Sequence, residues 1–133
     1  MGEISITPFK FKHFSMLVDM HESQKSPDSL IITYKTLPKV GFITYIGDMP
    51  VAAGLLRRVE PCFAQIDTLV SNAYCGGMIR HDGIRLVVDA LIEEAKRLDL
   101  KGIVAHTQDK GVLERAAALG FHVVPQTIIA LPL

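Results

Sequence analysis

The spacing of apolar residues predicts that the chain begins with a strand and a helix. "EISITP" alternates Ile4 and Ile6 with polar residues and ends at Pro8, which is typical of a short strand. Apolar residues three and four positions apart then predict a helix from about Lys10 to Glu22. "SQKSPDS" is a polar loop, and the pattern of "LIITYKTLP" fits either a helical turn or a strand.

The middle of the chain has the alternation of a three-stranded antiparallel meander. "VGFITYI" and "VAAGLLRRVE" carry many β-branched and aromatic residues, and "GDMP" between them has the composition of a turn. We interpret Gly54, inside the second of these strands, as a bulge. Pro61 ends that strand, and "FAQIDTLV" predicts a third one. Strands joined in succession by short turns form a meander.

The rest of the chain alternates helices with strands. After Gly76, Gly77 and a charged stretch, the apolar period changes from two to 3.6, which predicts a helix from Ile84 to Leu98. "KGIVAHT" predicts a short strand, "GVLERAAALG" a second helix closed by Gly120, and "FHVVPQTIIALPL" one or two terminal strands. A right-handed crossover makes "IDTLV" and "GIVAHT" parallel neighbours. The order predicts an α+β fold of three layers, with a mixed, mainly antiparallel sheet flanked by helices.

Composition narrows the class of protein. The 133 residues fit one domain, 1–133, and 49% of them are apolar. Fourteen basic residues balance fourteen acidic ones, which disfavours nucleic-acid binding. We expect a cytoplasmic protein with no membrane contact, because no apolar run reaches membrane length and no signal peptide is present. Cys62 and Cys75 are interpreted as reduced thiols. The apolar stretch "TIIALPL" can form either an interface strand or a core strand, so both a monomer and a homodimer fit the sequence.

Backbone freedom and charge gather directly before the predicted Ile84–Leu98 helix. Two glycines are followed by Arg80, His81 and Asp82, and then by Gly83. A helix N-terminus presents unpaired amides and the positive end of the helix dipole, so this loop is a candidate site for a phosphate. Neither the P-loop motif nor the dinucleotide-binding glycine motif is present. The alternative is a plain connector in which Asp82 caps the helix.

Residues from about Gly41 to Phe121 resemble the GCN5-related N-acetyltransferase (GNAT) family, which binds acetyl-coenzyme A. The segment from Arg80 to Ile84 resembles that family's R/Q-x-x-G-x-G/A pyrophosphate loop, and it lies between the expected strand and the expected long helix. Leu119-Gly120-Phe121 matches the family's leucine-glycine-phenylalanine turn. We therefore expect a divergent member of the family. Small variants of this fold with degraded motifs also occur in phage genomes, so a phage-type protein is one form that such a member can take.

The resemblance implies acetyl-CoA as co-substrate and no metal. It places the cofactor diphosphate at the amides from about Met78 to Ile84. The residues that it implies for cofactor binding lie in the preceding strand, in this loop and after the following strand: Leu69, Val70, Met78, Ile79, Arg80, His81, Asp82, Gly83, Ile84, Arg85 and Asp109.

The chemistry that the resemblance implies is direct attack of an amine on the thioester. A carboxylate, usually acting through water, serves as general base, and backbone amides at a splay between the two central strands stabilise the oxyanion. Asp67 in "IDTLV" and Glu60 at the end of the preceding strand are the candidate bases; the alternatives are a solvent-facing carboxylate and a rim charge. Tyr74 is a candidate acid toward the leaving thiolate, or else a loop aromatic that covers the core edge.

Three positions depart from the family pattern. Arg85 stands where a second glycine or alanine is usual, Ala116 where a tyrosine often acts as general acid, and Asp109 where asparagine is common. Two functions therefore stay open. One is an acetyl-CoA-dependent N-acyltransferase that acts on an amine of a small molecule or protein. The other is a catalytically silent binding or structural protein, for example in a phage or another assembly.

Overall fold

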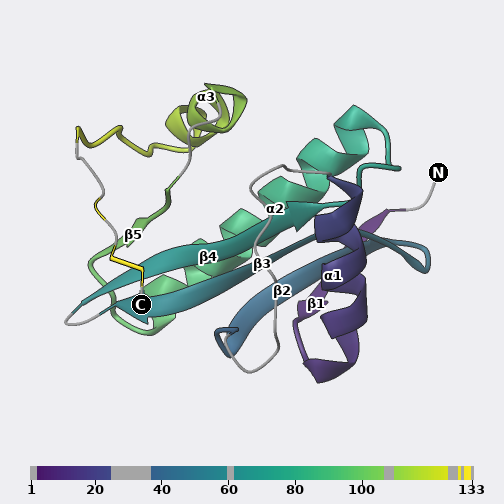
Figure 1. Ribbon diagram of the computed structural model, residues 1–133, viewed down its shortest axis with the longest axis horizontal. Coiled ribbons are helices and arrows are strands. Elements are labelled where there is room, and N and C mark those ends of the chain that lie inside the picture. Colours follow the sequence, from purple (N-terminus) through teal and green to yellow (C-terminus); the bar gives the residue numbers. More distant parts are fainter. Residues whose placement is uncertain are drawn as a thin grey trace.

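A computed structural model describes residues 3–24, 37–59, 62–106, 110–125, 129 and 131–132. Its five strands form one sheet in the order β1-β2-β3-β4-β5, antiparallel except for the parallel pair β4–β5 (Figure 1). This arrangement confirms the predicted fold class. The elements in chain order are β1 (Ile4–Pro8), the 3₁₀ turn η1 (Phe11–His13), α1 (Phe14–Ser23), β2 (Val40–Ile46), β3 (Met49–Val59), β4 (Phe63–Ser71), α2 (Gly77–Arg97), β5 (Gly102–Val104) and α3 (Lys110–Ala118).

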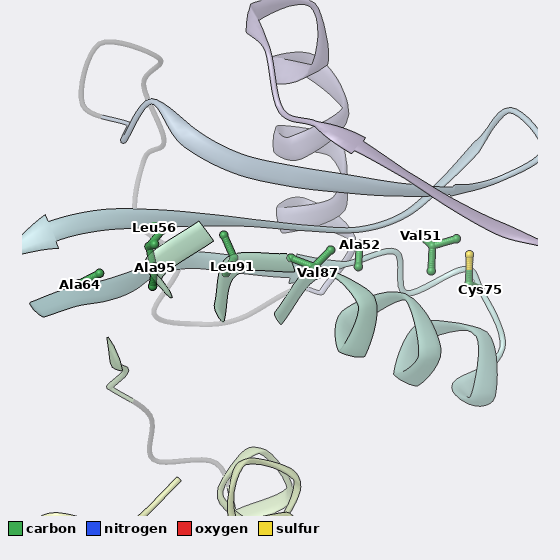
Figure 2. Close-up of a cluster of buried hydrophobic side chains, with 8 residues drawn as sticks. All are labelled: Val51, Ala52, Leu56, Ala64, Cys75, Val87, Leu91 and Ala95. Atoms are coloured by element: carbon green, nitrogen blue, oxygen red, sulfur yellow. The ribbon is translucent and has the colours of Figure 1, made fainter. Parts of the chain in front are cut away.

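Helices α1 and α2 cover opposite faces of the sheet, which produces three layers (Figure 1). Strand β3 is buried from Val51 to Leu56 because its side chains pack against both helices, Ala53 and Leu55 on the α1 face and the others on the α2 face. Figure 2 shows the cluster on the α2 face, made of Val51, Ala52, Leu56, Ala64, Cys75, Val87, Leu91 and Ala95. The cluster on the α1 face comprises Phe9, Leu17, Met20, Ile43, Ala53, Leu55 and Val70.

Gly54 serves close packing, and its interpretation as a bulge is wrong. The residue pairs in register with Phe42 on one side and Leu69 on the other. A Cβ atom at Gly54 would lie 2.7 Å from Cγ1 of Val87 in α2. The missing side chain therefore allows α2 to approach β3, a second reason for glycine within a strand that the sequence does not distinguish from a bulge.

The irregularity nearest to Gly54 lies in β4. Leu55 pairs with Thr68, whereas Leu56 pairs with Ile66, so Asp67 is the extra residue between the two pairs. A residue inserted in this way is left out of the ladder and bends its strand. The bulge therefore lies at Asp67, one of the two carboxylates that the family resemblance implies as a general base.

Helix α2 begins seven residues before the predicted Ile84. Its N-cap is Gly76, with no side-chain cap, so the prediction that Asp82 caps the helix is wrong. Gly83 explains the difference, because a Cβ atom there would lie 2.4 Å from Cγ1 of Val51. The apolar periodicity is interrupted where a glycine rests directly on the sheet, and the sequence pattern therefore suggested a loop.

The C-terminal third matches the prediction up to Gly120. Strand β5 lies parallel to β4, and α3 ends at Ala118 and is followed by Gly120, which has a φ of 95°. The amide of Phe121 donates to the carbonyl of Ala116 at 3.0 Å, and that of Gly120 to Ala117 at 3.0 Å, which is a Schellman ending.

The predicted terminal strands are not observed in the described part of the tail. Residues 121–125 belong to no strand, and Val123 and Val124 are 72% and 62% exposed. In this part of the tail the apolar pattern therefore does not lead to sheet pairing. Of the stretch 30–38, whose pattern fitted either a helical turn or a strand, residues 30–36 lie outside the described residues, and Leu37 and Pro38 belong to neither a helix nor a strand.

Two further features concern the whole described chain. None of its helices combines the length and the apolar character that crossing a membrane requires. Cys62 and Cys75 are both free thiols, half-buried and buried respectively.

Candidate functional site

The outer edge of β4 is open near the end of the strand. Strand β5 pairs with β4 only through Phe63–Gln65 and then separates from it, which gives the splay that the family resemblance implies (Figure 1). The backbone N–H of Asn72, just past the end of β4, donates to the carbonyl of Val51 in β3 at 2.7 Å. Since neighbouring backbone groups of a strand alternate in direction, the N–H groups of Leu69 and Ser71 are directed to the open edge. By the same alternation, the amide of Val70 is directed toward β3.

The loop between β4 and α2 is fastened by the side chain of Asn72. Its Nδ2 donates to the carbonyl of Pro50 at 3.0 Å, and its Oδ1 accepts the amide of Tyr74 at 3.0 Å. The Asn72 carbonyl accepts the amide of Cys75, also at 3.0 Å. These bonds hold the loop next to the β2–β3 hairpin, while the Tyr74 side chain is 83% exposed. The entry to α2 is therefore fixed in place.

The first turn of α2 offers backbone amides beside this loop. The first bond of the helical ladder runs from the Arg80 amide to the Gly76 carbonyl at 3.0 Å. The amides of Gly77, Met78 and Ile79 precede that bond, so they have no acceptor within the helix. A Cβ atom at Gly76 or Gly77 would meet nothing within 4 Å, so the backbone is open to an approaching ligand.

The early start of α2 leaves fewer free amides for a diphosphate than we predicted. From Arg80 to Ile84 the chain is already helical, and the amides of an α-helix interior donate to carbonyls four residues earlier. The expectation of free amides as far as Ile84 is therefore wrong, and the free amides are those of residues 77–79. The positive end of the helix dipole coincides with them.

Arg80 adds a cation at the same place. Its Nε donates to Oγ of Ser71 at 3.0 Å, which holds the guanidinium between the end of β4 and the start of α2. Arg80 is half-buried, and Ser71 is 2% exposed. A guanidinium next to free amides is a favourable environment for a phosphate.

Five of the residues predicted for cofactor binding lie further along α2. His81 and Asp82 are exposed in its second turn. Nε of Arg85 lies 3.9 Å from Oδ2 of Asp89, one turn later in the helix. Gly83 is buried against β3, and Ile84 packs on the core cluster of the α2 face. The structure therefore brings Met78, Ile79 and Arg80 to the loop and spreads these five residues over the faces of the helix.

Asp67 is held by an arginine. Arg57 donates to Oδ2 of Asp67 from Nη2 at 2.7 Å and from Nε at 3.1 Å. The two side chains are 45% and 27% exposed, Arg57 first, so water reaches the pair. Both bonds end on Oδ2, so the second oxygen of the carboxylate, Oδ1, is left by Arg57 to accept from a bound water. The other candidates Glu60 and Asp109 lie outside the described residues.

Two contacts from the end of α1 were not foreseen from the sequence. Oγ of Ser23 accepts the amide of Ala73 at 3.1 Å, and Oε1 of Gln24 accepts the amide of Ser71 at 2.8 Å. These partners are 50 and 47 residues apart in sequence, so no local pattern announces them. The role of Asn72 was also missed, although the sequence offered a signal for it, because an asparagine that follows a strand often organises a turn.

A cavity of about 410 Å³ lies at the opposite end of the sheet. Its lining comes from the start of β2, the end of β3, the start of β4 and the residues after α2: Leu37, Pro38, Lys39, Val40, Leu56, Arg57, Arg58, Ala64, Leu98 and Leu100. It includes no residue of the β4–α2 loop, although Arg57, which binds Asp67, lies in its lining. Within the described ranges no group of three or more His, Cys, Asp or Glu side chains could hold a metal ion.

Comparison with solved structures identifies the fold. An aminoglycoside acetyltransferase from an uncultured soil metagenomic sample, in complex with sisomicin, superposes with a TM-score of 0.74 at 11% identity, over 98% of this chain and 95% of that one. A predicted acetyltransferase from Clostridium acetobutylicum, solved with acetyl-CoA, gives a TM-score of 0.69 at 16% identity, over 97% of this chain and 96% of that one. AAC(6')-Iy, in complex with the bisubstrate analogue CoA-S-monomethyl-acetylneamine, gives 0.63 at 14% identity, over 98% and 99%.

The chain thus has the GNAT fold over nearly its whole length. The sequence has diverged far from these structures, with identities that show the fold alone. No family model matches the sequence, and no curated protein matches it. The phage-type version of the resemblance gains no support from the structures named above.

Proposed function

We propose that this protein is an acetyl-CoA-dependent N-acyltransferase that binds the coenzyme where β4 meets α2. The observation that carries the proposal is the group of amides from Gly77 to Ile79 beside the Arg80 guanidinium. A diphosphate is the ligand for which such an anion site is suited. The neighbouring amides of Leu69 and Ser71 at the open edge of β4 then lie where the acyl end of the coenzyme would run. The matched structures that contain acetyl-CoA or a CoA analogue support this assignment.

The proposed reaction forms an amide bond and breaks a thioester. An amine nitrogen attacks the acetyl carbonyl, an open-edge amide of β4 stabilises the oxyanion, and the thiolate leaves with a proton. Asp67 at the bulge is the candidate for removing the proton of the amine through water, and Tyr74 is the candidate for protonating the thiolate. The amine can belong to a small molecule or a protein, and we expect the reaction in the cytoplasm.

A second candidate is a protein that binds acyl-CoA without transferring the acyl group. The bond between Arg57 and Asp67 favours it, because it engages one of the two oxygens of the candidate base. Ala116 supports it as well, because alanine cannot donate a proton where the family often has tyrosine. Both candidates share the coenzyme site and differ only in the chemistry.

Replacing one residue tests the coenzyme site. Gly77→Pro removes one of the free amides, and the fold should survive because proline is favoured at the first helical position. Gly76 already has the extended backbone, φ −62° and ψ 154°, that a following proline requires. Gly77→Ala is the matched control, since it keeps the amide and its Cβ meets nothing within 4 Å.

The readout is the rise in melting temperature with acetyl-CoA concentration. A ligand that binds only the native state stabilises it by mass action, so wild type and Gly77→Ala should both show the rise. Gly77→Pro should show a much smaller one. An unchanged wild-type melting temperature at millimolar acetyl-CoA, or an equal rise for Gly77→Pro, would refute the proposed site.

Asp67→Asn separates the two candidates. In a transferase, this variant should keep acetyl-CoA binding and lose about 10²- to 10⁴-fold in the rate of amine acetylation. Asp89→Asn is the control, because Asp89 is a 52%-exposed carboxylate on α2 that touches neither loop nor bulge. Release of free CoA thiol across a panel of amines measures the rate. Binding without turnover in the wild type would select the silent protein.

A further inference from the structure

The open edge of β4 is partly occupied by a side chain from α1. Oε1 of Gln24 accepts the Ser71 amide at 2.8 Å and lies 3.4 Å from the Ser71 hydroxyl. Gln24 is the C-cap residue of α1, and in Figure 1 the end of that helix lies beside the arrowhead of β4. The contact therefore joins α1 to the strand edge at which the proposed coenzyme would run.

The chemistry of the contact matches that of an acyl-CoA. The carboxamide oxygen of Gln24 is a neutral carbonyl acceptor, as are the thioester and amide oxygens of the coenzyme. One strand amide has a single N–H, so it cannot donate fully to both acceptors. A ligand that uses the Ser71 amide must displace Gln24.

The surroundings allow that displacement. The side chain of Gln24 is exposed, so water can solvate the carboxamide once it has left the strand. The neighbouring bond from Ala73 to Oγ of Ser23, at 3.1 Å, still holds the end of α1 next to the loop. Arg80 also holds the Ser71 hydroxyl, at 3.0 Å, so the site keeps its cation when Gln24 moves.

We infer that Gln24 is an internal competitor that sets the affinity for acyl-CoA by occupying the Ser71 amide. The inference rests on the proposed function, because it needs the coenzyme to reach the open edge of β4. It assigns to α1 a part in coenzyme binding that no motif in the loop reveals. Gln24 touches the binding edge and no reacting atom, so it is a gating residue and takes no part in the chemistry.

Calorimetric titration with acetyl-CoA tests the inference on two variants. Gln24→Ala frees the Ser71 amide and should bind about five- to tenfold more tightly, the effect of one net hydrogen bond. Gln24→Glu should bind more weakly than wild type, because a carboxylate accepts the same N–H more strongly. Gln65→Ala is the control, since Gln65 lies in β4 but in the part paired with β5.

The outcomes separate this inference from the proposed function. Tighter binding by Gln24→Ala, or binding by that variant alone, supports the competitor. Equal dissociation constants for wild type, Gln24→Ala and Gln65→Ala overturn it and leave the coenzyme site intact. Absence of binding by wild type and Gln24→Ala overturns both. Circular dichroism of each variant shows that the fold is retained.

Discussion

At the scale of single residues, glycines in one helix have opposite roles. Gly77 opens the first turn of α2, where a Cβ atom would meet nothing within 4 Å. Gly83, six residues later, lies against the sheet, where a Cβ atom would be 2.4 Å from Val51 and 3.1 Å from Thr44. The first glycine faces open space and contributes a free backbone amide, and the second allows helix and sheet to touch. A substitution at Gly83 therefore reports on packing and not on phosphate binding.

Gly83→Ala should destabilise the protein by about 1–3 kcal/mol, because the added methyl group overpacks the contact with Val51. Gly77→Ala should raise the free energy of unfolding by about 0.4–1 kcal/mol, since the alanine restricts the unfolded chain without meeting a neighbour. Urea unfolding measures both. An equal effect of the two alanines would contradict the packing role of Gly83.

His13 gives the fold a dependence on pH. It is 4% exposed, and its Nδ1 accepts the Lys10 amide at 2.8 Å. Burial foremost, and then the nearby cations of Lys12 and Lys10, hold the pKa of His13 below its usual value. Since the native pKa is the lower one, the unfolded state binds more protons as the pH falls below about 6.5. The contribution of His13 to stability is present above that pH and is lost as the pH falls through the native pKa.

We therefore expect the urea midpoint to fall as the pH is lowered from about 7.5 to about 5, through the ordinary histidine range. His13→Asn keeps an acceptor for the Lys10 amide and removes the titrating ring, so its midpoint should fall less over this range. A pH profile of His13→Asn that parallels the wild-type profile would assign the dependence to other groups.

At the scale of elements, α2 and α3 are unequal partners of the sheet. Helix α2 buries Gly83, Val87, Val88, Leu91 and Ala95. Helix α3 has an amphipathic sequence and a complete Schellman ending, yet none of its residues is buried. Local signals are thus sufficient to begin and end a helix, but they do not determine how firmly it packs.

Amide hydrogen exchange should show this difference. We expect amides of α2 from Val87 to Leu91 to exchange only with global unfolding, because that segment lies in the core. Amides of α3 should exchange through local opening at a much lower free energy, which native-state exchange in low urea can measure. Equal protection of the two helices would contradict the exposed position of α3, because it would require α3 to pack as closely against the rest of the protein as α2 does.

Features of the fold that depend on local contacts could be predicted from the sequence, and those that depend on distant contacts could not. The meander, the parallel β4–β5 pair and the turn at Gly120 were predictable, because alternation, periodicity and a glycine at C′ are local signals. The start of α2 was not, because Gly83 looks like a loop residue until its contact with Val51 is known. The bond from Ser71 to Gln24 joins residues far apart in sequence and had no local signal.

At the scale of the whole molecule, the splay of the sheet and the entry of α2 define one end as the candidate site. The strand edge, the fastened loop and the first turn of α2 meet there, with α1 reaching them from the opposite face. The cavity near Leu37 and Leu100 lies at the other end and includes none of these groups. We therefore expect the coenzyme to bind at the first of these ends.

Amide chemical shifts recorded during titration with acetyl-CoA test that claim most directly. We expect the largest changes on the amides of Gly77, Met78 and Ile79 and on that of Ser71, with little change around the distant cavity. Changes centred on Leu37, Arg58 and Leu100, or none at millimolar acetyl-CoA, would contradict it.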